Sequence, residues 1–356
     1  MKAKRGLVLA GLLTAFGTPF AGTLEELKNL LSTEGVEINL ALTADYLYTA
    51  NRDDSNGTVK VEPDKFGFNS FLGIFKTASE SDPLGFGLAV SNNAWAPVVG
   101  IEPMPDADNQ YTVDQAYVEL MLGKVSVLAG RILTNIGGEA PYTWQNVNIQ
   151  RGLVWNGEPV FYNGFRISFD AAPFGFYFGV NDRDTADGKF AVEAGISGSW
   201  SELKTDWSFN VLYPDKADEN NARVFNLTTN FGGLEFAPIT FYADYLNVPT
   251  DQGDRNAWGF ALLTDLTITE KTSMGFRVER VIQEDGVDAY GIGCGNDAWT
   301  VTLTPKYAFN RYLYLRAEAS YVSLDDPAFV KKYYPDGTAA YDDSEWRFGA
   351  EVGFVF

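Results

Sequence analysis

The chain of 356 residues contains no histidine and a single cysteine, Cys294. Histidine is the commonest general base of enzymes and the commonest ligand of bound metal ions, so its absence argues against nucleophilic triads, zinc sites and haem sites. One cysteine cannot form an internal disulfide, and the glycines around it indicate a loop. We therefore expect no catalytic residues, no enzymatic activity, no metal and no cofactor.

Long apolar segments are also missing. After the first 21 residues no run of about 18 apolar residues occurs, which excludes transmembrane helices. Positive charge is scarce as well, because 27 basic residues face 47 acidic ones and the net charge is −20. Such a chain repels nucleic acid, so we expect no nucleic-acid partner. The acidic excess favours cations as partners, although the solubility of the loops explains it equally well.

The N-terminal residues predict export and then a short helix. Residues 1–21 resemble a secretory signal peptide, since a basic start precedes an apolar stretch and small residues follow near Ala21. In residues 22–35, Thr23 and Glu26 form a capping box before a stripe of leucines. We expect this helix to pack on the periplasmic rim or inside a pore, with a coiled-coil arm as the alternative.

The last thirteen residues, 344–356, alternate between two kinds of side chain. Side chains of a strand point alternately to its two faces, so one face of this segment suits lipid and the other suits water. The first face carries Trp346, Phe348, Ala350, Val352, Phe354 and Phe356, and the second carries Arg347, Gly349, Glu351 and Gly353. The chain then ends on its aromatic residue, as outer-membrane barrels of Gram-negative bacteria usually do.

The same alternation recurs from Val36 onward, so residues 36–356 predict one all-β domain, a transmembrane antiparallel β-barrel. Seven short turns and eight long Asp/Asn/Gly-rich loops alternate along the chain, one of the loops at 248–255. They predict about sixteen strands with both termini in the periplasm. Fourteen strands is the alternative, because the strands at 66–76 and 111–123 have the weakest pattern. A soluble β-sandwich also alternates, but it does not explain the signal peptide or the aromatic residues at the strand ends.

A barrel of this size is too wide for side chains to fill, so an aqueous channel remains unless a segment plugs it. The best candidate is 137–160, a long loop that carries Trp144 and Trp155, more apolar surface than an external loop normally exposes. We expect it to fold inward; a lid over the barrel or a contact with a neighbouring subunit is the alternative. Both tryptophans are also candidates for stacking on a ligand.

The candidate pore constriction combines charges on this loop with charges beside it. Its members are Arg131, Glu139, Arg151, Glu158 and Arg166. Opposed basic and acidic side chains across a narrow waist create a transverse field that filters solutes by charge. The alternative is that inward-facing charges only satisfy one another in a wet interior, where an ion pair contributes little.

One stretch resembles a known family. It comprises Ala116 to Leu120, the turn Gly123-Lys124, Gly130-Arg131, the loop start Gly137 to Glu139, and the return strand Asn163 to Arg166. This pattern is similar to that of the OmpL-like β-barrel porins of Gram-negative bacteria. The resemblance implies an outer-membrane barrel and passive diffusion of small hydrophilic solutes. It transfers no binding site.

These observations predict an outer-membrane porin, exported through a cleaved signal peptide and embedded among lipid and lipopolysaccharide. Its water-filled channel passes ions and small hydrophilic solutes by passive diffusion, with a preference for cations, and a homotrimer is the expected assembly. The alternative is an occluded structural or surface-recognition barrel in the same membrane.

Overall fold

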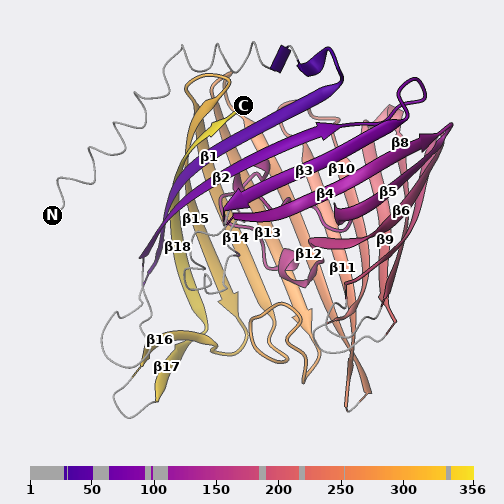
Figure 1. The fold of residues 1–356 in the computed structure, drawn as a ribbon. Helices are drawn as coiled ribbons and strands as arrows, with labels where there is room; N and C mark the ends of the chain where they lie inside the picture. Colours follow the sequence, from indigo (N-terminus) through magenta and orange to yellow (C-terminus); the bar gives the residue numbers. More distant parts are fainter. Residues whose placement is uncertain are drawn as a thin grey trace.

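The computed structural model describes residues 28–29, 31–50, 64–92, 98, 111–183, 190–215, 221–251, 253–333 and 338–356. Sixteen of the described strands close into a single antiparallel barrel (Figure 1). Each strand pairs with its neighbours in sequence, except that β15 pairs with β18 because β16 and β17 form a separate hairpin. The fold class predicted from the alternation is confirmed.

The barrel strands have the following bounds: β1 (Val36–Thr49), β2 (Asp64–Lys76), β3 (Leu84–Asn92), β4 (Tyr111–Leu122), β5 (Val125–Leu133), β6 (Phe161–Ala171), β7 (Phe174–Asn181), β8 (Ala191–Trp200), β9 (Thr205–Pro214), β10 (Arg223–Phe231), β11 (Ile239–Thr250), β12 (Gly253–Thr267), β13 (Thr272–Gln283), β14 (Ala298–Ala308), β15 (Leu313–Leu324) and β18 (Ser344–Val355). The separate hairpin is β16 (Phe329–Tyr333) and β17 (Ala339–Asp342).

The first and last strands seal the barrel. β1 pairs with β18 from Ala41 opposite Val355 to Thr49 opposite Arg347. The terminal residue continues the ladder, because the backbone N–H of Phe356 donates to the carbonyl of Leu40 at 2.8 Å. Closure leaves the barrel sheet without a free edge, so each of the sixteen barrel strands has its backbone partners within the barrel.

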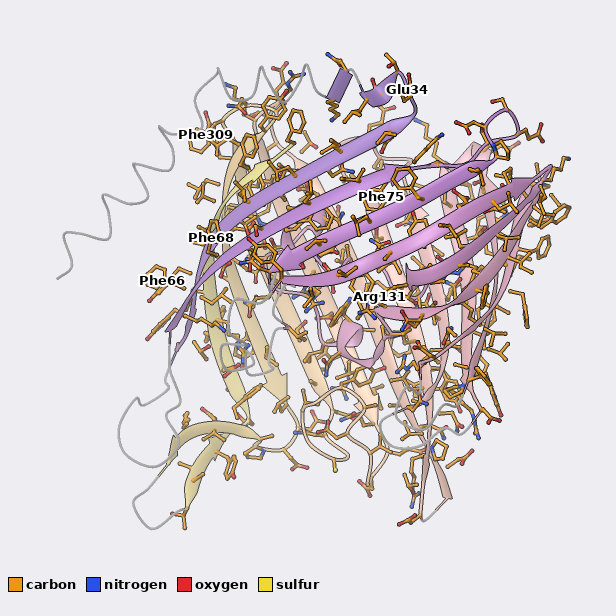
Figure 2. The ribbon with its side chains drawn as sticks, viewed as in Figure 1. Glu34, Phe66, Phe68, Phe75, Arg131 and Phe309 are labelled. Atoms are coloured by element: carbon orange, nitrogen blue, oxygen red, sulfur yellow. The ribbon has the colours of Figure 1, made fainter. Side chains whose placement is uncertain are left out.

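The two faces of the wall differ as the alternation predicts. In β6, Phe165 and Ile167 on the outer face are 64% and 48% exposed, whereas Arg166 between them points inward and is buried. Figure 2 shows Phe66 and Phe68 of β2 projecting away from the barrel. The exposed outer face is therefore apolar over the barrel, as a surface in contact with lipid must be.

The lengths of the connections distinguish the two ends of the barrel. The start of β1 and the C-terminus lie at one end, the short-turn end, where the connections are brief (Figure 1). The weakly patterned segments 66–76 and 111–123 are strands β2 and β4, so sixteen strands replace the alternative of fourteen. The β16–β17 hairpin lies at the opposite, long-loop end.

The prediction of a long loop at 248–255 is wrong. β11 and β12 pair as far as Thr250 opposite Gly253, so only a tight turn separates them. Proline, glycine and acidic residues in this segment are typical of loops, yet Val248 lies opposite Arg255 and Pro249 lies opposite Asp254 in the ladder. A strand that rises beyond the lipid keeps its backbone pairing and loses only the need for an apolar face.

Parts of the N-terminal predictions fall outside the described residues. The signal peptide, 1–21, lies entirely outside them, and so does most of the helix expected in 22–35. Lys28, Asn29, Leu31 and Ser32 are helical, and the Lys28 ammonium lies 5.0 Å from the centre of the Phe356 ring. Within the described ranges, no helix is long and apolar enough to span a membrane.

Candidate functional site

The connection between β5 and β6, residues 134–160, folds into the barrel, and we call it the inner loop. Ile149, Leu153 and Val154 within it are fully buried, although the segment has only two short 3₁₀ turns of its own. Trp155 is 8% exposed, while Trp144 is half-buried and stacks on Tyr142 at 5.0 Å. The inward fold expected from the two tryptophans is therefore present.

Hydrogen bonds tie the inner loop to the far wall of the barrel. Arg277 on β13 donates to the carbonyl of Gln150 at 2.6 Å, and the Gln150 side chain donates to Glu318 on β15 at 2.9 Å. Arg316, also on β15, donates to the carbonyl of Thr143 at 2.7 Å. Charged wall groups thus satisfy loop carbonyls and amides that burial would otherwise leave without partners.

Glu139 is the centre of these contacts. Its carboxylate accepts from Arg277 at 2.8 Å, from the backbone N–H of Gly152 at 2.7 Å and from the Tyr242 hydroxyl at 3.0 Å. Arg277 also lies 3.3 Å from Glu279 on its own strand. The three charged side chains are at most 1% exposed, so the ion pairs are held away from bulk water.

Arg166 anchors the root of the loop. Its Nε lies 2.8 Å from Glu193 on β8, and its guanidinium also donates to the Tyr162 hydroxyl at 2.8 Å. A further N–H donates to the carbonyl of Leu133 at 3.0 Å, where β5 ends and the loop begins. The hydrogen bonds of this guanidinium go to the wall and to the root of the loop, so Arg166 is a positioning residue.

Arg151 is a buried charge within the loop itself. Its guanidinium stacks on Trp155, 3.3 Å from the centre of the ring, and the residue is only 4% exposed. Burial lowers the pKa of Arg151 to about 9, against the opposing pull of the Glu139 and Glu158 carboxylates. The Nε and one terminal nitrogen of Arg151 find no hydrogen-bond partner among the described residues.

Glu158 occupies the returning arm of the loop. Its carboxyl lies beside that of Asp244 on β11 and against Gly137, where a Cβ would come within 2.0 Å of it. Gly137 has φ +101°, a conformation that favours glycine. Burial, the neighbouring Asp244 and then Glu139 raise the pKa of Glu158 well above its ordinary value.

The fifth predicted residue, Arg131, lies apart from this arrangement. It stands near the long-loop end of β5, opposite Ala116 and Asn163, and its guanidinium is 5.5 Å from the Phe161 ring. Among the described residues it forms none of the ion pairs of the inner loop. The structure thus brings Glu139, Arg151 and Glu158 together on the loop and Arg166 at its root.

The wall partners of the loop were only partly visible in the sequence. Inward parity along β13 and β15 marks Arg277, Glu279, Arg316 and Glu318, but nothing in the spacing connects them to the loop. Tyr242 was not singled out, although it shares the inward face of β11 with Asp244. No described group of three or more acidic or cysteine side chains is arranged to hold a metal ion.

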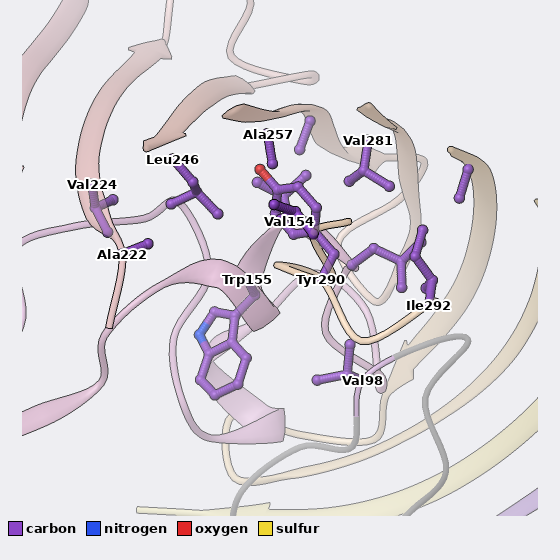
Figure 3. Close-up of a cluster of buried hydrophobic side chains, with 14 of the residues drawn as sticks. Val98, Val154, Trp155, Ala222, Val224, Leu246, Ala257, Val281, Tyr290 and Ile292 are labelled. Carbon is purple, nitrogen blue, oxygen red and sulfur yellow. The ribbon is translucent and has the colours of Figure 1, made fainter. Parts of the chain in front are cut away.

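An apolar cluster packs the loop against the wall (Figure 3). Leu153, Val154 and Trp155 meet inward residues such as Leu246 and the fully buried Tyr290, which belongs to the connection between β13 and β14. Figure 3 also shows Val98, from the connection between β3 and β4, at the edge of the cluster. The loop is therefore a packed wedge with its own core inside the barrel.

A smaller cluster supports the other side of the loop. Tyr142 packs on Phe71 of β2 at 4.6 Å between ring centres, and its hydroxyl donates to Asp114 on β4 at 2.8 Å. Ala41 and Ala89 complete this cluster. The loop therefore spans the lumen between opposite parts of the wall.

Comparison with known proteins agrees with this architecture. A model of the family described as "putative beta-barrel porin-2, OmpL-like" matches residues 35–356. No curated protein gives a significant match to the chain.

Solved structures of outer-membrane proteins have the same fold. An anion-selective porin from Comamonas acidovorans is 12% identical with a TM-score of 0.62, and the match covers 90% of this chain and 99% of that one. The outer membrane channel DcaP of Acinetobacter baumannii is 14% identical with a TM-score of 0.60, covering 91% and 98%. OmpT of Vibrio cholerae in a trimer form is 12% identical with a TM-score of 0.59, covering 90% and 99%. At these identities the similarity concerns the fold alone.

The family match extends from one residue before β1 to the last residue, so it includes the whole barrel and the inner loop. The chain therefore belongs to the OmpL-like family of outer-membrane β-barrel porins.

Proposed function

We propose that the protein is a diffusion porin and not an enzyme, with a water-filled channel that passes ions and small hydrophilic solutes. The observation that carries this proposal is the inner loop, which Arg277, Arg316 and Glu318 hold at a fixed place across the lumen. A rigid loop narrows a wide barrel without changing its closure, so it sets an upper size for solutes.

The charges at the loop favour cations. Four carboxyl groups, those of Glu139, Glu158, Asp244 and Glu279, surround the guanidinium groups of Arg151 and Arg277. Glu158 and Asp244 lie side by side, so one proton shared between them still leaves more negative than positive charge. The Comamonas acidovorans relative is anion-selective, and we expect the opposite preference here.

The assembly and location follow from the same features. The apolar outer face contacts lipid and lipopolysaccharide, and the trimer form of Vibrio cholerae OmpT supports a homotrimer of this chain. Export depends on cleavage of residues 1–21 as a signal peptide. In this orientation the short-turn end faces the periplasm and the long-loop end faces outward.

The second candidate is an occluded barrel that serves in structure or surface recognition. The apolar cluster around Leu153, Val154 and Trp155 favours it, because packed side chains fill much of the lumen. Solvent-accessible inward side chains on β4 to β7, such as Tyr117 and the exposed Asp170, favour the porin.

Swelling of liposomes that contain the refolded, signal-free protein distinguishes the two candidates. A porin lets a small neutral sugar enter, so the vesicles swell at a rate that falls with sugar size. A reversal potential under a potassium chloride gradient, measured in planar bilayers, then has the sign of cation preference. Vesicles that hold folded protein and do not swell would favour the occluded barrel.

A further inference from the structure

The inner loop encloses a cavity at its own root. The cavity has a volume of about 270 Å³ and lies between the outgoing arm of the loop, 133–141, and the returning arm, which contributes Trp155, Pro159 and Val160. Asn135, one of its walls, is exposed, so the cavity is open to solvent. Pockets for drug-sized ligands begin at about 300 Å³, so this cavity suits a smaller molecule.

Two glycines let the outgoing arm run close against the barrel wall. A Cβ on Gly137 would collide with the carboxyl group of Glu158, and a Cβ on Gly138 would collide with the ring of Tyr242. Any larger residue at these positions would push the arm away from the wall and toward the returning arm. The two glycines therefore keep the space between the arms open.

The same stretch presents free backbone donors. Within the described ranges, the N–H groups of Gly137, Gly138 and Glu139 donate to no protein acceptor. Across the cavity, the indole N–H of Trp155 also finds no acceptor in the part of the chain that the structure describes. Such groups must bind either water or a solute, because a polar group without a partner is costly. The cavity thus has free donors on both of its arms.

Free acceptors lie beside these donors. The carbonyl groups of Ile136, Gly137 and Gly138 accept no hydrogen bond from any described residue. A hydroxyl group donates one hydrogen bond and accepts others, so alternating donors and acceptors match a molecule that carries several hydroxyl groups.

The charged groups around the cavity are already paired. Glu139 is the charged residue among its walls, and its carboxylate is bound to Arg277 and Tyr242. The nearby Arg166 is paired with Glu193. An ion that entered the cavity would lose hydration without gaining a free counter-charge, which is unfavourable. The walls therefore favour a neutral solute.

Trp155 supplies an apolar surface on the returning arm. The guanidinium of Arg151 covers one face of the indole, 3.3 Å from the ring centre, so a solute can contact only the rest of the ring and its N–H. Pro141 and Pro159 extend the apolar part of the walls. An aromatic ring with a polar edge suits a solute that is itself apolar on one face and hydroxylated at its rim.

From these contacts we propose that the cavity at the root of the inner loop is a binding site for a neutral polyhydroxylated solute of the size of a monosaccharide. The solute is held between the free backbone groups of 136–139 and the indole of Trp155. The role of this site in uptake rests on the proposed function.

Saturation-transfer NMR with D-glucose tests the site on the refolded, signal-free protein in detergent, where no current is needed. We expect saturable binding of glucose, and sodium gluconate, an anion of similar size, should not compete with it. Absence of glucose binding, or competition by gluconate at equal concentration, would overturn the proposal.

A matched pair of tryptophan variants locates the glucose. Trp155→Phe keeps an aromatic ring and removes the N–H, so binding should weaken about fivefold, the usual effect of one hydrogen bond. Trp144→Phe is the control, because Trp144 belongs to the same loop but stacks on Tyr142 and does not line the cavity. Equal effects of the two changes, or none from Trp155→Phe, would place glucose elsewhere.

Ala140→Leu tests the cavity without removing any side-chain hydrogen bond. Ala140 lines the cavity on the outgoing arm, so the larger side chain reduces its volume. Glucose binding should be lost while the unfolding temperature stays close to that of the parent. A variant that binds glucose as the parent does would contradict the site.

The two proposals fail in different ways. If the folded protein conducts and binds no glucose, the porin survives and the site is overturned. If the folded protein binds glucose with the expected effects of the variants but passes no current, the site survives and the proposed function is overturned.

Discussion

Arg277 on β13 and Glu139 on the inner loop form an ion pair of 2.8 Å between residues 138 positions apart in the chain. Neither side chain is more than 1% exposed. The pair therefore fixes where the loop crosses the barrel.

Arg277→Met removes one member of this buried pair and leaves Glu139 without its cation. Breaking such a pair typically costs about 3–5 kcal/mol, because the remaining charge stays buried. We expect the loop to detach, so that single-channel conductance rises and the protein unfolds at lower temperature. Both quantities are measurable on the refolded protein.

Arg280→Met is the control. Arg280 lies on the same strand, 2.5 Å from Asp297, but both side chains are 20% exposed near the long-loop end. A partly exposed pair contributes about 0–1 kcal/mol, so conductance and unfolding temperature stay close to the parent values. Similar effects of the two changes would show that the loop does not depend on the Arg277 pair.

Trp155→Ala tests the apolar cluster that packs the inner loop against the wall. The side chain contributes to the cluster with Leu153 and Val154 and covers the guanidinium of Arg151. Loss of a buried tryptophan side chain costs about 3–5 kcal/mol of stability, and here it weakens the docking of the loop on the wall. We expect noisy currents and protease cleavage within 134–160, measured on intact barrels.

Trp346→Ala serves for comparison, because Trp346 is 47% exposed on the outer face, where it stacks near Phe348. Its removal weakens the contact with lipid and leaves the inner loop uncut. Protease-resistant loops in both variants would mean that Trp155 does not hold the wedge together.

Much of the barrel follows from local patterns. Alternation with period two predicts each strand separately, and the short turns predict the order of pairing, so the sixteen strands needed no long-range information. The exception, 248–255, shows the limit: Pro249 and Asp254 are residues typical of loops, yet they lie opposite each other in the β11–β12 ladder.

The site depends on information that spacing does not carry. Glu139 and Glu158 are visible as loop charges, but their partners, Arg277 and Asp244, are set by the curvature of the closed wall. These partnerships have no signature in a single sequence.

Glu158 gives the loop a dependence on pH. Since its pKa is raised in the folded protein, the folded state holds the proton more tightly than the unfolded state does. The free energy that protonated Glu158 contributes to loop docking is therefore fully present below the ordinary carboxyl pKa. It is lost by about 1.4 kcal/mol per pH unit as the pH rises from there through the raised pKa. Current noise should increase with pH over this range.

Glu158→Gln mimics the protonated carboxyl and cannot ionise. The variant should show quiet currents over the whole range in which the parent becomes noisy, with the same conductance at low pH. If the variant and the parent respond identically to pH, another group causes the effect.

Asp170→Asn tests the contribution of an exposed carboxylate on the barrel wall to selectivity. Asp170 is exposed on the inward face of β6, so loss of its charge lowers the local cation concentration. The reversal potential under a potassium chloride gradient should move toward zero. Asp82→Asn, in the turn between β2 and β3 where Asp82 pairs with Lys76, should leave it unchanged.

Single-channel conductance of the refolded, signal-free protein in a planar bilayer is the most direct test of the central claim. An open channel narrowed by a fixed loop predicts stable, ohmic current steps whose size increases in Arg277→Met. Folded protein that inserts and passes no current, with the loop docked or detached, would contradict the porin and support an occluded barrel.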